Sequence, residues 1–451
     1  MFQVSKVGSL ALLCCIAWAY FSLQSNAPTS ENAGMAAFTV GIGIALSMLI
    51  ELRSGYKNLL RADIICIVGV YFLTLYEFLF PQPELDRKIS PEQAYGGLEL
   101  ILMGLFFLII GRHLYREQRS QPIVAKANHP GRINVNILLT LFYLCFFLGF
   151  FYILLKVDFN PVVMVERAML PRFTQPWARG RLGGSFVFLS ELQLFTYAVP
   201  PLAGIIFNNR KHLSRFSVLI VFVLLSVTLF MGFAGGTRNV FLSYLVGFVG
   251  GFVLSMEKVS IRKLLLPGTL ILFTAYIGAN YMFQFRSIGL KKYLQGQRET
   301  AINEDQVYVD HNLYTIGVLR QTFPGRYEFL GTEVFVWALV KPIPRVLWSG
   351  KPEGLSKSME EVAGAEGYTL ASTYIGESYM AGGIPIVIFV SLVFGYLAAW
   401  WNAKAQFTGE ALLVYALGLF VAAITMRSLF MFTTAVLPIF GVNFLLRFLR
   451  K

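Results

Sequence analysis

The chain has 451 residues, of which 56% are hydrophobic and 14% are charged, and its mean hydropathy is +0.61. A soluble globular domain carries about 25% charged residues, so this composition excludes a soluble enzyme or binding module. The net charge of +13 does not indicate nucleic acid, because few Lys or Arg residues are free to form a soluble basic face. In a membrane protein this charge indicates orientation and anionic, lipid-linked ligands.

The apolar residues come in blocks close to the roughly 20 residues that cross a bilayer core, and backbone polar groups in lipid must be paired within helices. We therefore predict an all-α polytopic membrane protein with about twelve transmembrane helices. The expected spans are 7–24, 33–51, 62–80, 93–111, 134–155, 184–207, 216–234, 240–256, 264–285, 383–401, 411–426 and 429–446. The first block resembles a signal peptide, but Pro28 would block cleavage, so we keep it as a helix.

The basic residues predict the orientation of these spans. The connections on the side of the two termini hold 19 of the 38 Lys and Arg residues, and the short connections on the other side hold nine. The positive-inside rule then places both termini in the cytoplasm, and we expect a bacterial inner membrane. The expected domains are nine transmembrane helices in 1–285 with a basic periplasmic loop at 157–183, a large helical periplasmic loop at 286–382, and three transmembrane helices in 383–451.

The first basic outer loop holds four arginines that run against the orientation rule: Arg167, Arg172, Arg179 and Arg181. A solvated loop with snorkelling arginines is one interpretation, and an anion site at the outer membrane surface is the one we prefer. Another outward arginine follows in the turn Gly235-Gly236-Thr237-Arg238. Because glycine permits positive φ and close approach of the backbone to a ligand, we expect Arg238 at the depth of the lipid headgroups.

The outer loop 286–382 is the only connection large enough to form a subdomain. Its apolar residues have helical spacing, which predicts helices lying along the membrane surface. The expected apolar faces are Leu313, Ile316, Leu319 and Phe323 in one helix and Phe335, Ala338 and Leu339 in the next. The run Lys341-Pro342-Ile343-Pro344-Arg345 must end a helix, because each proline lacks a donor and fixes φ. We expect this rigid turn to present Lys341 and Arg345 together.

His311 is the only one of the four histidines in an outer segment, so a histidine base for an external reaction is this residue, with Asp310 as its orienting group or as the base itself. An ordinary loop histidine is the alternative. Glu377 stands just before the tenth span, where a carboxylate is costly unless it is paired. Structural pairing is the expected answer for the other ionisable residues in apolar blocks: Glu77, Glu99, Glu191 and Arg427. The sequence holds no zinc-type His/Glu spacing, Walker loop or Asp-rich cluster, so we expect no metal or nucleotide cofactor.

Three motifs resemble those of the Wzy-type O-antigen and oligosaccharide repeat-unit polymerases. They are Thr237-Arg238 in its glycine-rich turn, Lys-Pro-Ile-Pro-Arg-Val-Leu-Trp-Ser-Gly-Lys-Pro at 341–352, and Gly-Glu-Ser-Tyr-Met-Ala-Gly-Gly at 376–383. The similarity extends to the topology, with its large outer loop late in the chain, and implies a GT-C-like fold. An Arg-x10-Gly pattern in two outer loops of that family is matched here by Arg172 to Gly183 and by Arg320 to Gly331.

The resemblance implies a glycosyltransferase that moves a growing glycan from undecaprenyl pyrophosphate to a new lipid-linked repeat unit, at the periplasmic face and without metal or nucleotide. Such an enzyme stabilises the pyrophosphate leaving group, for which arginine is suited, and places a base near the acceptor hydroxyl. The residues expected to bind substrate are Arg238, Arg286, Arg345, Lys341, Arg172 and Arg320. The expected base is His311, with Glu377 second. The expected partners are the lipid-linked oligosaccharide, membrane lipid and a chain-length regulator, but no nucleic acid.

Two alternatives stay open from the sequence. An O-antigen ligase, which transfers glycan to the lipid A core, shares the donor and the fold, and the pair His311-Asn312 resembles that family; the motif at 341–352 favours the polymerase. A lipid-linked oligosaccharide transporter also has twelve spans, but that fold carries its long loop in the middle of the chain on the cytoplasmic side. The middle connection here, 208–215, is short.

Overall fold

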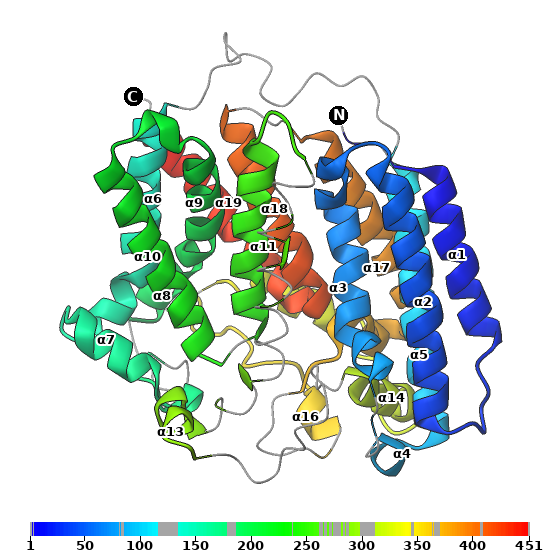
Figure 1. The fold of residues 1–451 in the computed structure, drawn as a ribbon. Coiled ribbons are helices and arrows are strands. Elements are labelled where there is room, and N and C mark those ends of the chain that lie inside the picture. Colours follow the sequence, from blue (N-terminus) through cyan, green and yellow to red (C-terminus); the bar gives the residue numbers. More distant parts are fainter. Residues whose placement is uncertain are drawn as a thin grey trace.

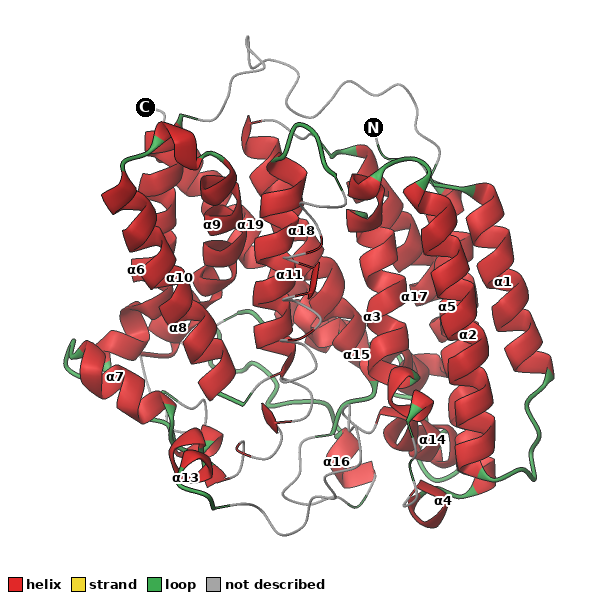
Figure 2. Cartoon of the chain, in the orientation of Figure 1, coloured by secondary structure: helices red, strands yellow, loops and turns green. Residues whose placement is uncertain are grey.

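The computed structural model describes the chain except for residues 1, 3, 81, 83–84, 116–133, 178–185, 237, 261–264, 266–267, 270–272, 274–280, 283–284, 286–287, 298–311, 344–346, 363, 365–369, 406–408 and 450–451. Every regular element in this described part is a helix, and none is a strand (Figure 2). Six helices are long and apolar enough to cross a membrane, which confirms an all-helical, membrane-embedded protein.

The elements of the first half are α1 (Lys6–Phe21), α2 (Thr29–Leu52), η1 (Tyr56–Leu60), α3 (Ala62–Thr74), η2 (Tyr76–Leu79), α4 (Leu85–Lys88), α5 (Pro91–Leu114), α6 (Val135–Leu155), α7 (Pro161–Ala168), η3 (Arg172–Thr174), α8 (Phe186–Glu191), η5 (Leu192–Ala198), α9 (Val199–Asn208) and η6 (Arg210–His212). Those of the second half are α10 (Arg215–Ala234), α11 (Arg238–Ser255), α13 (Leu290–Leu294), α14 (Asn312–Thr322), α15 (Glu333–Val340), α16 (Met359–Val362), α17 (Thr373–Ala403), α18 (Gly409–Arg427), η7 (Leu429–Met431) and α19 (Phe432–Leu449).

The expected spans overlap these helices, except that the span 264–285 lies largely outside the described residues. The span expected at 184–207 is broken into α8, η5 and α9. The long helices stand side by side, and the start of α1 and the end of α19 lie at the same end of the bundle (Figure 1). The short helices α4, α7, α13, α14 and α16 gather at the opposite end (Figure 1). We call these the terminal end and the loop end.

Helix α17 consists of two helical segments that meet at a kink, where Gly383 has a φ of +72°, a conformation open to glycine. The first segment lies against the second: the ring centre of Tyr374 is 5.2 Å from that of Phe394, and its hydroxyl is 3.0 Å from the hydroxyl of Ser391. Residues 373–381 therefore fold back along the rest of the helix. We call them the re-entrant segment, and all of them are buried.

The re-entrant segment runs from the middle of the bundle toward the loop end. Ile375 packs on Gly104, halfway along α5. Tyr379 reaches Arg320, whose side chain packs on Gly96 near the start of α5. The sequence predicts that the tenth span begins at 383, whereas the helix begins ten residues earlier. Backbone that is interrupted at membrane depth is tolerated where protein surrounds it, and the full burial of this segment meets that condition.

The large outer loop predicted at 286–382, which we call the late loop, matches its predicted helices in part. The expected apolar face of α14 is confirmed, since four side chains are at most 1% exposed: Leu313, Ile316, Leu319 and Phe323. Helix α15 ends at Val340, directly before the proline-containing run, as expected. Its predicted face is confirmed at Ala338, which is buried, but is wrong at Leu339, which is 65% exposed, because Val334 packs beside Ala338 in its place.

Helix α5 and the second segment of α17 pack with their backbones in close contact. The backbone of Gly111 faces the backbone of Leu392, and a Cβ atom at Gly111 would lie 2.4 Å from the carbonyl oxygen of Leu392. In the same way, a Cβ atom at Gly395 would lie 2.2 Å from the carbonyl oxygen of Leu108. Small residues let membrane helices approach this closely, so α17 is held along α5 between the two polar clusters described next.

Candidate functional site

Four of the eight residues expected at a site have described side chains: Arg172, Arg320, Lys341 and Glu377. Three others lie outside the described residues: His311, Arg286 and Arg345. Arg238 is the first residue of α11, but its side chain is outside the described part. Three of the described side chains lie around the re-entrant segment. The exception is Arg172 in η3, the short helix after α7. Helix α7 lies on the far side of the bundle from α14 (Figure 1).

Arg320, on α14, belongs to an ion pair that is partly exposed. Its Nη2 is 3.5 Å from Oε2 of Glu99 on α5, and the two side chains are 35% and 18% exposed. Oε1 of Glu99 accepts a hydrogen bond of 3.1 Å from the hydroxyl of Tyr20 at the end of α1. Nη1 of Arg320 donates to the hydroxyl of Tyr379 at 3.0 Å, and the guanidinium lies 5.5 Å from the centre of that ring. We call these four residues the Arg320 cluster.

The hydrogen bonds of Tyr379 fix the orientation of this arginine. The hydroxyl of Tyr379 donates its one hydrogen to the carbonyl of Phe323 at 3.0 Å, so it accepts from Arg320. Partial burial alone lowers the pKa of Arg320, but the hydrogen bond with Tyr379 and the charge of Glu99 outweigh it and raise that pKa above its ordinary value. The guanidinium therefore stays cationic and is accessible from one side.

The Arg-x10-Gly spacing of this loop has a structural explanation. Arg320 bonds to Tyr379, and the amide of Gly331, whose φ is +57°, donates to the carbonyl of Ala381 at 3.0 Å. Both ends of the pattern therefore contact the re-entrant segment. The cis peptide bond before Pro324 lies between them. The ten residues between Arg320 and Gly331 therefore form the connection that brings the chain from α14 back to this segment.

Glu377 is 2% exposed and caps the turn between α18 and α19. Its Oε1 accepts a hydrogen bond of 2.7 Å from the hydroxyl of Ser428, and its Oε2 accepts from the backbone amide of Leu429. Amides at the start of a helix have no partner within the helix, and a carboxylate is favourable at that positive end. Because both oxygens of Glu377 hold this turn, the geometry favours a positioning role over that of a general base.

Lys341 follows α15 and lies near the same turn. Its Nζ is 5.6 Å from the ring centre of Phe430, and its charge acts on the carboxylate of Glu377. Nζ of Lys351 donates to the carbonyl of Lys341 at 2.6 Å and to that of Ile343 at 2.8 Å. Lys351 thus binds the carbonyl of the C-cap residue and one carbonyl beyond it, and it closes the turn that the prolines predict. Arg345, its expected companion, lies outside the described residues.

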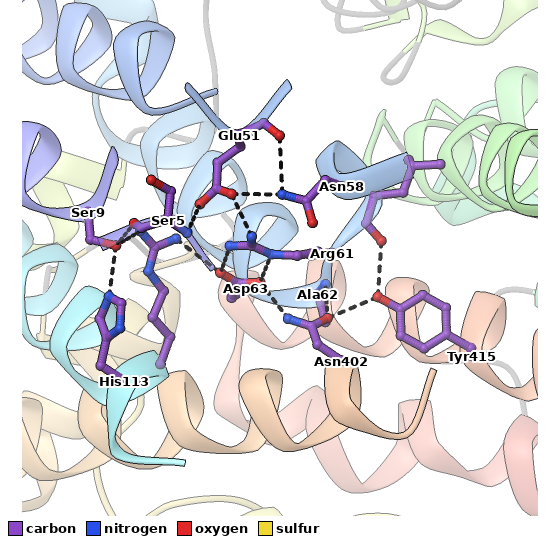
Figure 3. A network of polar contacts seen from close by, with 12 residues as sticks. Ser5, Ser9, Glu51, Asn58, Arg61, Ala62, Asp63, His113, Asn402 and Tyr415 are labelled. Atoms are coloured by element: carbon purple, nitrogen blue, oxygen red, sulfur yellow. Dashed lines mark hydrogen bonds and ion pairs between the residues drawn. The ribbon is translucent and has the colours of Figure 1, made fainter. Parts of the chain in front are cut away.

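A second polar cluster lies at the terminal end (Figure 3). Arg61 is fully buried between two carboxylates: Nη1 is 2.8 Å from Oε2 of Glu51, and Nη2 is 2.7 Å from Oδ2 of Asp63. Nη1 of Arg112 is 3.0 Å from the same oxygen of Asp63. Two positive and two negative charges therefore balance in the interior, as buried charges require. We call these four residues the buried ion network.

The buried ion network ties the two halves of the chain together. Asn402 on α17 donates through Nδ2 to Asp63, and its Oδ1 accepts from the amide of Ala62 at 2.8 Å and from the hydroxyl of Tyr415 on α18 at 2.9 Å (Figure 3). Ser5 and Asn58 bond to Glu51, and Ser9 bonds to Arg112 and to His113 (Figure 3). The helices α1, α2, α3, α5, α17 and α18 are thereby fastened at one end.

Sequence reasoning missed most of these partners. The expectation that Glu99 is structurally paired is confirmed, but Tyr20 and Tyr379 carried no signal in the sequence. Arg61 and Arg112 count as cytoplasmic loop cations in the orientation rule, yet both are buried because two carboxylates neutralise them. Within the described ranges, no group of three or more His, Cys, Asp or Glu side chains is placed to hold a metal ion.

The start of α14 is also anchored in the bundle. Nδ2 of Asn312, which is fully buried, donates to the carbonyl of Leu73 at 2.7 Å, near the end of α3. Its Oδ1 has no hydrogen-bond partner among the residues that the structure describes.

The chain matches no protein-family model, and comparisons with curated proteins and with solved structures find no significant similarity.

Proposed function

We propose that this chain is a Wzy-type polymerase that joins undecaprenyl-pyrophosphate-linked oligosaccharide repeat units into a surface polysaccharide. It acts at the periplasmic face of a bacterial inner membrane, with both termini in the cytoplasm. The observation that supports this most is the Arg320 cluster, a partly exposed cation among tyrosines at the loop end. Ionisable residues at membrane depth are costly and mark functional sites. A lipid-linked pyrophosphate glycan presents an anion and sugar rings there, which arginine and tyrosine bind.

In the proposed reaction, a hydroxyl of the incoming repeat unit attacks the anomeric carbon of the donor glycan, and undecaprenyl pyrophosphate leaves. A fixed cation stabilises the charge that develops on the leaving group, and Arg320 takes this role among the described side chains. The sequence adds four further candidates for the pyrophosphate: Arg238, Arg286, Arg345 and Lys341. Arg172 is the fifth residue that the sequence offers, but it follows α7, which lies on the other side of the bundle from α14 (Figure 1), so we do not place it beside Arg320. The donor is already activated, so the proposed reaction needs no nucleotide, and the family resemblance implies that it needs no metal.

His311 is the proposed base for the acceptor hydroxyl. Glu377 comes second, because its two oxygens already accept hydrogen bonds from Ser428 and Leu429. We assign this carboxylate to holding the re-entrant segment in place. The lipid-linked oligosaccharide and membrane lipid are the proposed partners, together with a chain-length regulator.

Transport is less compatible with this architecture. Alternating access requires one half of a transporter to rock against the other. Here α17 is fastened at the terminal end, where Asn402 bonds to Asp63, and at the loop end, where Tyr379 bonds to Arg320. Breaking a buried ion pair costs about 3–5 kcal/mol, so a network of this kind favours a fixed scaffold, as an enzyme requires.

The test of the proposed function is the surface glycan profile of a deletion strain on a silver-stained gel. A single repeat unit on the lipid core, with the ladder of longer chains lost and then restored by the wild-type gene, supports the polymerase. Loss of every repeat unit from the core, with lipid-linked polymer accumulating, would identify a ligase instead. An unchanged ladder would reject both.

A further inference from the structure

Helix α15 belongs to the late loop, yet it is apolar on every side. Its sequence is Glu-Val-Phe-Val-Trp-Ala-Leu-Val, with a single charged residue at the start. Val334 and Ala338 are buried against the bundle, whereas Val336 and Leu339 on the other face are 48% and 65% exposed. A helix that is hydrophobic all round belongs in a protein core or a membrane. The open face of α15 therefore requires an apolar neighbour.

The turn after α15 exposes further apolar side chains. Ile343 is 36% exposed, Leu347 is 75% exposed and Trp348 is 42% exposed. With Val336 and Leu339 they form one set, which we call the α15 surface. Scattered apolar side chains on a protein surface are ordinary, but a concentration of this size within one short segment marks an interaction site.

The position of α15 identifies what covers this surface. The hydroxyl of Thr433, in the first turn of α19, donates to the carbonyl of Ala338. Positions three and four residues apart share one face of a helix, and the face of α19 that begins at this residue continues as an exposed apolar stripe. Its members are Leu437, Phe440, Phe444 and Phe448, at 37%, 66%, 70% and 70% exposed.

This stripe lies on one of the six helices that are long and apolar enough to cross a membrane, so lipid is its neighbour. Ala338, on the packed face of α15, contacts Thr433 at the start of this stripe, so the open face of α15 lies beside it. Two features indicate the depth. Glu333 at the helix start accepts an exposed hydrogen bond of 2.8 Å from the hydroxyl of Ser356, and the partly exposed Trp348 follows in the turn. Tryptophan beside polar side chains is typical of the interface between hydrocarbon and headgroups.

We propose that the α15 surface is inserted into the outer leaflet of the bilayer, at the boundary between hydrocarbon and headgroups. The occupant of this surface is the bilayer itself. Helix α15 then lies flat beside α19, and the membrane sets the height of Lys341 and of the turn that Glu377 caps. The inference goes beyond the proposed function, because it concerns how the late loop is held and not which reaction follows.

The test uses the full-length protein in nanodiscs of phosphatidylethanolamine and phosphatidylglycerol, with a water-soluble maleimide. The variants are Leu339→Cys and Leu347→Cys, and the matched control is Glu328→Cys, an exposed position between α14 and α15. The wild-type chain, whose four cysteines lie in apolar blocks, gives the background. A thiol held in lipid stays protonated and is out of reach of a water-soluble reagent, so both variants should label roughly tenfold more slowly than the control, or slower still. Labelling at the rate of the control would overturn the proposal.

A second measurement covers the case in which a cysteine variant fails to fold. Leu339→Trp and Glu328→Trp are compared in nanodiscs whose lipids carry bromine on the acyl chains. Bromine quenches tryptophan at close range, so the proposal requires additional quenching, relative to the wild-type chain, for Leu339→Trp only. Equal quenching of the two variants would overturn it. Neither measurement depends on polymerase activity, so failure here is distinct from failure of the proposed function.

Discussion

The hydroxyl of Ser428 donates a hydrogen bond of 2.7 Å to Oε1 of Glu377, and this contact joins the turn between α18 and α19 to the re-entrant segment. Removing the carboxylate leaves the buried amide of Leu429 without its acceptor. An orphaned buried donor costs about 1–3 kcal/mol, so Glu377→Ala should lower the midpoint of thermal unfolding. Ser428→Ala leaves the carboxylate on the amide and should lower the midpoint less.

Tryptophan fluorescence of the purified variants during heating measures these midpoints, and the glycan ladder of the complemented strain measures activity. The positioning role predicts that midpoint and activity fall together in Glu377→Ala. An unchanged midpoint with complete loss of the ladder would contradict that role and would make Glu377 a candidate base.

The buried ion network predicts a large effect from a small change. Asp63→Asn keeps the shape of the side chain but removes the negative charge that lies against Arg61 and Arg112. Removing one partner of a buried pair leaves an uncompensated charge and costs about 3–5 kcal/mol. We expect a strongly lowered unfolding midpoint or loss of the protein from the membrane fraction.

The matched control is an exposed ion pair in the late loop, between Lys357 and Glu361. Water and salt screen such pairs, so Glu361→Gln should leave the midpoint unchanged. If Asp63→Asn shifted the midpoint no more than Glu361→Gln does, the buried ion network would have no part in fastening the bundle.

The Arg320 cluster predicts separate effects on activity and stability. Arg320→Ala removes a contact that fastens α17 at the loop end, but this partly exposed pair costs less to lose than the buried ion network. It also removes the proposed contact to pyrophosphate. We expect loss of the polymer ladder with normal membrane insertion. Arg320→Lys keeps the charge without the planar fork of donors and should restore the ladder only weakly.

Arg326 supplies the control for this change. It is exposed, lies six residues further along the same loop, and its guanidinium is 5.3 Å from the ring centre of Tyr327. Arg326→Ala should give a normal ladder on the same gel. A ladder of normal length from Arg320→Ala would remove this arginine from the site.

The sequence locates the six long apolar helices because length and hydrophobicity are local properties. The expected span 134–155 coincides with α6, Val135–Leu155. The buried face of α14 was equally readable, since a helical period brings Leu313 and Ile316 to one side. The two closely spaced prolines after Lys341 remove donors and fix φ, which located the end of α15, whereas the single prolines Pro385 and Pro438 lie inside α17 and α19.

The re-entrant segment was not readable in this way. A pair of glycines before an apolar block has the pattern of a loop boundary, and the segment ahead of it contains Glu377 among its apolar residues. Its burial depends on packing against α5 and α14, which no local pattern records. The pairing of Arg320 with Glu99 joins residues 221 positions apart. Charges such as Arg61 and Arg112 normally snorkel to the interface, and only their carboxylate partners explain why these two do not.

The assignment of the base rests on a comparison between histidines on opposite sides of the membrane. His311→Ala and His311→Gln should both lose the polymer ladder, because neither side chain can accept the proton of the acceptor hydroxyl near neutral pH. His212→Ala is the control: this residue is exposed in η6, at the end of the bundle that we place in the cytoplasm, and its ladder should be normal. A normal ladder from either His311 variant would leave Glu377 as the base. In that case Glu377→Ala would have to abolish the polymer without changing thermal unfolding, which the hydrogen bonds from Ser428 and Leu429 argue against.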